Sequence, residues 1–145
     1  MAKVYVFTAD GFEEIEGLTV VDLFRRAGAQ TEMVSVSGSL SVKGSHGIEI
    51  KADRLFEDID FQDADLLVLP GGMPGTKYLA AHPGLCALLK EKAAAGRRVA
   101  AICAAPSVLG GLGILEGRRA VCYPGFEQML TGASVSEKEV ETDGN

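Results

Sequence analysis

Residues 98–106 read RVAAICAAP, a short apolar run that ends in a cysteine between small residues. We predict a buried strand over Arg98–Ile102, a sharp turn at Cys103 and a helix that begins near Ala104. Small residues permit such a tight strand–turn–helix, and Pro106 is tolerated in the first helical turn. A thiol at a helix N-terminus lies among unsatisfied N–H groups, which favour the thiolate and a lowered pKa. The alternative is a buried, inert cysteine.

The rest of the chain alternates strands and helices in the same way. Strands are expected at residues 4–8, 31–36, 65–69, 98–102 and 120–122, and helices at 13–27, about 77–81, 83–95 and 126–130. Residues 40–42 and 48–50 alternate in polarity across a glycine-rich turn, as the arms of an exposed hairpin do. Continuous apolar strands between helices indicate a mostly parallel sheet covered on both faces. We therefore predict an α/β, flavodoxin-like, doubly wound sandwich with a small appended β-hairpin.

The end of the chain differs from this pattern. Glu139–Thr142 reads as a strand, and Asp143 with Gly144 is a strong hairpin-turn signal. The sequence ends at Asn145, before a return strand. We expect one domain over residues 1–145 that lacks a C-terminal strand and helix.

Composition excludes several classes of protein. The 145 residues are 47% hydrophobic, with a formal net charge of −6. Acidic and basic residues are interspersed, so the sequence contains no basic patch that would bind nucleic acid or anionic lipid. No apolar run approaches the roughly 20 residues of a membrane span. Three cysteines suggest a reducing compartment. The N-terminus enters a strand directly, which leaves no room for a signal peptide, so we expect a cytoplasmic protein.

Glu16 is the candidate partner of the thiol. It shares one helical face with three apolar residues, Val20, Phe24 and Ala27. A carboxyl group on a buried stripe needs a partner, and the rim that carries Cys103 supplies one. Partial burial beside a thiolate favours the protonated form, which could move a proton. Glu13 and Glu14 lie on other faces and are expected to be solvated.

Backbone amides supply the third part of the predicted site. Gly71 and Gly72 end the strand over residues 65–69, where their N–H groups could serve, with that of Ala104, as an oxyanion or binding site. A plain turn is an equal alternative for the glycine pair. Cys122, Tyr123 and His46 are possible pocket residues, although core and surface roles explain them as well. No metal-ligand spacing and no phosphate loop occurs, so no metal and no cofactor is expected.

Four ordered motifs resemble one family. They are GFEEIE at residues 11–16, DLFRRAG at 22–28, VLPGG at 68–72 and AAICAAP at 100–106. Together they resemble the DJ-1/PfpI superfamily, specifically its DJ-1/ThiJ branch. The resemblance implies that Cys103 is the reactive cysteine, Glu16 its protonated partner, and Gly71 and Gly72 the oxyanion site. It also implies a homodimer that works without a cofactor.

The chain departs from related patterns at three positions. The protease branch has His directly after the cysteine, where this chain has Ala104, so a Cys–His peptidase is not expected. Tyr123 and His46 stand where DJ-1 itself has His and Arg, which leaves substrate binding by those groups open.

The sequence is compatible with two functions. The leading hypothesis is a glyoxalase- or deglycase-type enzyme that acts on dicarbonyls or glycated groups under carbonyl and oxidative stress. The alternative is a redox sensor or chaperone that uses oxidation of Cys103. Glutamine amidotransferase-like hydrolysis lacks a convincing histidine.

Overall fold

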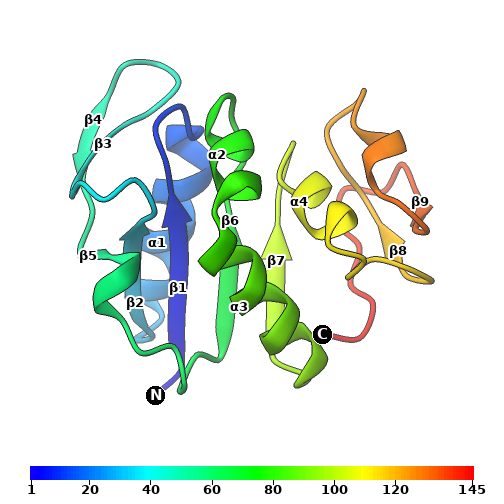
Figure 1. The fold of residues 1–145 in the computed structure, drawn as a ribbon, viewed down its shortest axis with the longest axis horizontal. Helices are drawn as coiled ribbons and strands as arrows, with labels where there is room; N and C mark the ends of the chain where they lie inside the picture. Colours follow the sequence, from blue (N-terminus) through cyan, green and yellow to red (C-terminus); the bar gives the residue numbers. More distant parts are fainter.

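A five-stranded, entirely parallel sheet forms the centre of the computed structural model, which describes residues 1–145 (Figure 1). The strands of this sheet are β5 (Arg54–Leu55), β2 (Gln30–Ser35), β1 (Lys3–Thr8), β6 (Leu66–Leu69) and β7 (Arg98–Ala101), in spatial order. The helices are α1 (Glu14–Arg26), α2 (Gly75–Ala81), α3 (Pro83–Ala94) and α4 (Pro106–Gly111). Short 3₁₀ turns occupy Phe56–Asp58 and Glu127–Met129. Helix α1 covers one face of the sheet, and α2 and α3 cover the other. The predicted doubly wound sandwich is confirmed.

Strand β1 shows why the central strands are apolar throughout. Its side chains point alternately to the two faces, so each must pack under a helical layer. Tyr5 and Phe7 join the larger core beneath α2 and α3, whereas Val4 and Val6 join a second core with Val21 of α1.

The strand order reverses between β1 and β6. The chain passes from β1 through α1 to β2 on one side, and β6 later pairs with the other side of β1. Parallel sheets bind ligands at the carboxyl ends of the strands, at such a reversal point. The turn after β1 and Pro70–Gly72 after β6 meet there.

The predicted hairpin is present as β3 (Ser41–Lys43) and β4 (Glu49–Lys51), which pair antiparallel. Its underside packs on the turn after β1, where Phe12, Val42 and Ala52 form a small separate core. The hairpin is thereby fixed at the same end of the sheet as the strand reversal.

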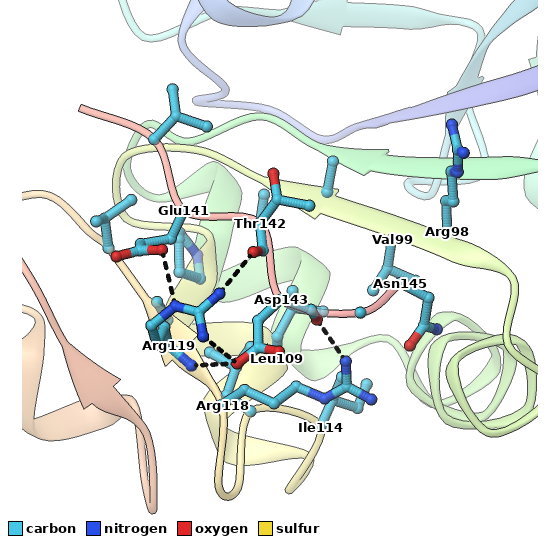
Figure 2. A pocket seen from close by; sticks show the side chains of 18 residues that line it. Arg98, Val99, Leu109, Ile114, Arg118, Arg119, Glu141, Thr142, Asp143 and Asn145 are labelled. Atoms are coloured by element: carbon cyan, nitrogen blue, oxygen red, sulfur yellow. Dashed lines mark hydrogen bonds and ion pairs between the residues drawn. The ribbon is translucent and has the colours of Figure 1, made fainter. Parts of the chain in front are cut away.

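The expected strand over Glu139–Thr142 is wrong, because residues 136–145 contain no regular structure. Figure 2 shows Arg119 holding this segment through Glu141, Asp143 and the Thr142 carbonyl. Arg118 donates to the Asp143 carbonyl at 2.6 Å. Side chains therefore hold much of this segment, which no strand pairs.

This segment borders a groove of about 510 Å³ along the free edge of β7 (Figure 2). The Val99 N–H donates to the Asn145 carbonyl at 3.0 Å, a backbone bond that crosses from β7 to the segment. β7 is therefore an edge strand of alternating exposure, not the buried strand that its apolar sequence predicts. The segment after α4 adds a short parallel pair, β8 (Arg119–Ala120) with β9 (Ser134–Val135).

None of the four helices combines the length and the apolar character that a membrane crossing requires.

Candidate active site

Cys103 lies on a strained turn between β7 and α4. It is the one residue other than glycine with a positive φ, 62°. A side chain at such a φ is uncommon, and strained residues of this kind gather at functional sites. The Tyr123 N–H donates to the Cys103 carbonyl at 2.8 Å, and the two alanines that follow are buried. The predicted sharp turn is present, although helix α4 begins at Pro106 rather than near Ala104.

Gly71 brings three elements together at this turn. A Cβ atom on Gly71 would lie 2.6 Å from the Cys103 Cβ and 2.7 Å from Glu16 Oε2, so only glycine fits between them. The Gly71 N–H donates to Glu16 Oε2 at 2.7 Å, and its carbonyl accepts from the Glu13 N–H at 2.8 Å. The structure thus places Glu16 beside Cys103, at the strand reversal.

The electrostatic setting of Cys103 differs from the sequence expectation. Burial raises the pKa of the thiol, and the charge and hydrogen bond of Glu16 raise this pKa further. The N–H groups of Ala104 and Gly72 act in the opposite direction without outweighing these effects. The expected lowering of the pKa is therefore wrong, because burial of the thiol and the facing Glu16 outweigh the two N–H groups.

The three amides predicted for an oxyanion site have different partners. The Gly71 N–H donates to Glu16 Oε2. The N–H groups of Gly72 and Ala104 instead lie near the sulfur of Cys103, where they act to lower its pKa. Gly72 has a φ of 92°, and a Cβ there would lie 2.3 Å from the Glu13 nitrogen. Two donors at the sulfur are thus available to a developing negative charge.

The remaining predicted residues are spread around this centre. Tyr123 is connected to it through the backbone bond to Cys103, but its side chain is 58% exposed. Burial raises the pKa of the Cys122 thiol, which lies one residue earlier and is partly buried. Burial likewise raises the pKa of Cys86, whose thiol donates to the Ala80 carbonyl at 3.3 Å.

His46 lies in the hairpin loop and contacts glutamates rather than the cysteine. Its Nδ1 lies 3.1 Å from Glu13 Oε1 and 3.2 Å from Glu14 Oε2. Ligand atoms of these three residues lie within 4.8 Å of one another, as metal ligands would. The Glu14 oxygens, however, accept hydrogen bonds from the loop, so we interpret the cluster as an ion pair.

Glu14 itself corrects the sequence analysis. The sequence predicts a solvated side chain, yet Glu14 is only 5% exposed, whereas Glu16 is half-buried. Helical phase misses this burial because the covering residues belong to the hairpin, not to the sheet. A signal was present in the sequence: Gly44 and Gly47 flank a loop whose N–H groups need an acceptor.

Comparison with known proteins decides the family. A profile of the DJ-1/PfpI family matches residues 2–145. The chain belongs to the DJ-1/PfpI family. The chain is 33% identical to protein dj-1beta of Drosophila melanogaster over 97% of its own length and 76% of that protein. It is also 30% identical to a deglycase of Pyrococcus abyssi, over 99% of this chain and 86% of that enzyme.

Solved structures of DJ-1 proteins agree with this family assignment. A DJ-1 superfamily protein of Salmonella typhimurium, crystallised as a cysteine-to-alanine variant, superposes with a TM-score of 0.95 at 35% identity. That match covers all of this chain and 79% of the other. The oxidized DJ-1 of Toxoplasma gondii gives 0.94 at 37% identity, over 99% and 79% of the two chains.

The DJ-1 homolog B of Arabidopsis thaliana is 40% identical over 98% of this chain. The matched region covers only 33% of the length of that protein. The family relationship therefore extends across the described fold, while activity, substrates and partners have to be argued from the site.

Proposed function

We propose that this DJ-1/PfpI protein is a cofactor-independent, cysteine-dependent enzyme that acts on small reactive dicarbonyls or their adducts. The observation that carries the proposal is the position of the Glu16 carboxylate beside the Cys103 thiol on a strained turn, with two amide donors at the sulfur. The relatives named deglycase are consistent with such an activity.

The raised pKa of the Cys103 thiol makes Glu16 the base of the first step. As the sulfur attacks the aldehyde carbon of methylglyoxal, the thiol proton passes to the Glu16 carboxylate and a C–S bond forms. The oxygen of the former carbonyl becomes an oxyanion, which the N–H groups of Gly72 and Ala104 stabilise until Glu16 returns the proton.

The next steps convert the adduct without an external oxidant. Glu16 removes the proton from the carbon that is bonded to sulfur and the proton returns to the neighbouring carbon. This transfer oxidises the first carbon to a thioester and reduces the second to an alcohol. Water then cleaves the C–S bond, which releases lactate and restores the thiol. One methylglyoxal and one water give one lactic acid, so the redox balance is zero.

A test compares the native protein with Cys103→Ala and Glu16→Gln for loss of methylglyoxal and formation of lactate. We expect turnover by the native protein and none by either variant, with folding checked by circular dichroism. Equal turnover by all three proteins would refute the enzymatic role.

A second function has its own support, namely the two amide donors at the sulfur of Cys103. They could equally hold the oxygens of a sulfinate, as a redox sensor or chaperone would require. Graded oxidation with activity measured in parallel separates the two functions. Residues 1–145 as a single domain, a homodimer and a cytoplasmic location remain predictions.

A further inference from the structure

The carboxylate of Glu14 is buried and serves the hairpin loop rather than the cysteine. It accepts from the His46 N–H at 2.8 Å, the Ile48 N–H at 3.3 Å and the Ser45 hydroxyl at 3.3 Å. The imidazole of His46 contacts the same carboxylate at 3.2 Å. Burial raises the pKa of Glu14, but these bonds and one from its own N–H prevail and hold it at about 2. The group is therefore a carboxylate at neutral pH.

Gly44 gives this carboxylate its space. A Cβ atom on Gly44 would lie 2.2 Å from both Cδ and Oε1 of Glu14, whereas the backbone of Gly44 adopts no positive φ that would oppose alanine. Gly44 N–H also donates to the Ile48 carbonyl at 2.9 Å, which closes the loop. The loop over residues 44–48 is thus shaped around the carboxylate.

The same loop supports the turn between β1 and α1. Ser45 N–H donates to the Phe12 carbonyl at 2.8 Å, and Gly11 N–H donates to the Lys43 carbonyl at 2.8 Å. The Lys43 N–H donates to Asp10 Oδ1 at 2.9 Å. One side of residues 10–13 is therefore held by the hairpin.

The other side of residues 10–13 lies against the candidate active site. A Cβ on Gly72 would come within 2.3 Å of the Glu13 nitrogen, 2.6 Å of the Gly11 carbonyl oxygen and 2.7 Å of the Phe12 carbonyl carbon. Glu13 N–H also donates to the Gly71 carbonyl at 2.8 Å. The turn is consequently sandwiched between the hairpin loop and the glycine pair that faces Cys103.

We infer that Glu14 is a positioning residue, whose buried carboxylate holds the hairpin loop against residues 10–13 and so keeps the Gly72 N–H directed at Cys103. This role deepens the proposed function and rests on it. Glutamine at position 14 would turn an NH₂ group toward donors of the loop, so the loop loses acceptors. The turn beneath it is then free to move away from Gly72.

The experiment uses two variants that disturb the carboxylate in different ways. Glu14→Gln removes its charge, and Gly44→Ala displaces the unaltered carboxylate with a methyl group. Glu49→Gln alters another carboxylate of the same hairpin, which accepts only from the Ser41 hydroxyl at 2.8 Å, and serves as the control for charge. Gly111→Ala, where a Cβ meets nothing within 4 Å, is the control for the methyl group.

The first measurement is hydrogen exchange at the backbone amides of His46 and Ile48. The second is the pH dependence of the rate at which Cys103 is alkylated, which peptide mass spectrometry measures for this cysteine alone. Both variants should accelerate the exchange. They should also slow alkylation at pH 7 about tenfold, because a lost N–H donor raises the thiol pKa by about one unit. Both controls should match the native protein.

The double variant provides the decisive comparison. Since both changes act through one carboxylate, its alkylation defect should equal that of either single variant rather than their product. Faster exchange with an unchanged alkylation profile would show that Glu14 only stabilises the loop, and would overturn the inference. If Glu14→Gln does not fold, Gly44→Ala and the milder Ser45→Ala carry the test.

Neither measurement requires turnover. If the native protein does not consume methylglyoxal, the proposed function fails while exchange and alkylation still decide the role of Glu14. If turnover is present and both variants alkylate normally, only the inference about Glu14 fails.

Discussion

Glu16 Oε2 accepts the Gly71 N–H at 2.7 Å, and this bond holds the carboxyl group of Glu16 beside Cys103. No lysine, arginine or histidine forms an ion pair with Glu16, so nothing basic offsets its effect on the thiol. Under the proposed function, this pair exchanges one proton between sulfur and carboxylate.

Removing that charge should make the thiol more acidic. We expect Glu16→Gln to lower the pKa of Cys103, because the charge of Glu16 raises it in the native protein. The pH at which alkylation of Cys103 is half-maximal measures this pKa, with Glu49→Gln as the control. Turnover of methylglyoxal should nevertheless be lost. An unchanged or higher pKa would mean that Glu16 holds the proton at rest, as the family resemblance implies.

His46 should titrate above its ordinary range. Hydrogen bonding to Glu14 and the charge of Glu13 raise the pKa of its imidazole above 6.5. The ion pair therefore contributes fully below pH 6.5 and disappears as the pH rises through the raised value. The two histidines of the chain can be resolved by NMR, with His46→Gln for assignment. Glu14→Gln should move the midpoint downward, and an unshifted midpoint would contradict the ion pair.

The low pKa of Glu14 has a separate consequence in acid. A carboxylate with a pKa of about 2 contributes stability above its unfolded value of about 4.3, and this stability is lost as the pH falls toward 2. Urea unfolding between pH 5 and 2 should show a steeper loss for the native protein than for Glu14→Gln. Parallel curves for the two proteins would refute the assignment.

Phe12 should carry much of the attachment of the hairpin. It is fully buried against Val42 and Ala52, beneath the hairpin and away from the two main cores. We expect Phe12→Ala to lower the free energy of unfolding by about 3–5 kcal/mol. Urea denaturation measures this loss, and Tyr78→Ala, at a half-exposed ring, should cost far less. Equal losses would contradict the packing described for Phe12.

Peroxide should oxidise Cys103 before the other two cysteines. Only Cys103 combines a neighbouring carboxylate that can accept its proton with the amide donors of Gly72 and Ala104. Burial alone raises the pKa of Cys86, whereas Cys122 has the charge of Glu127 and a single amide donor, the N–H of Phe126, to set against the two donors at Cys103. Mass spectrometry after graded peroxide should find oxidation at Cys103 first. An even distribution over the three thiols would count against both of the proposed functions.

Much of the fold was predictable because its strands are locally encoded. The apolar runs of β1 and β6 need cover on both faces, which already implies a parallel sheet with helices on each side. The end of the chain was not predictable in the same way. Whether residues 139–142 form a strand depends on a pairing partner. Arg119 holds them without one, through an ion pair with Glu141 and a hydrogen bond to the Thr142 carbonyl.

The sequence predicted which residues of the candidate site lie together, but not their electrostatics. Motif spacing placed Cys103, Glu16 and the glycine pair at one rim. Helical phase reports only which face meets the sheet, so it could not reveal that the hairpin buries Glu14. The raised pKa of Cys103 likewise depends on the burial of its thiol and on Glu16 beside the sulfur, and both are properties of the assembled fold.

The backbone conformation of Cys103 places the thiol at the candidate site but lowers the stability of the fold. Glycine adopts a φ of 62° without the steric strain that cysteine has there. We therefore expect Cys103→Gly to raise the stability of the fold and to abolish the proposed activity. Selection of variants for thermal stability alone would therefore favour glycine over cysteine at position 103. Under the proposed function, the strained turn therefore lowers the stability of the fold at the position where the reaction takes place.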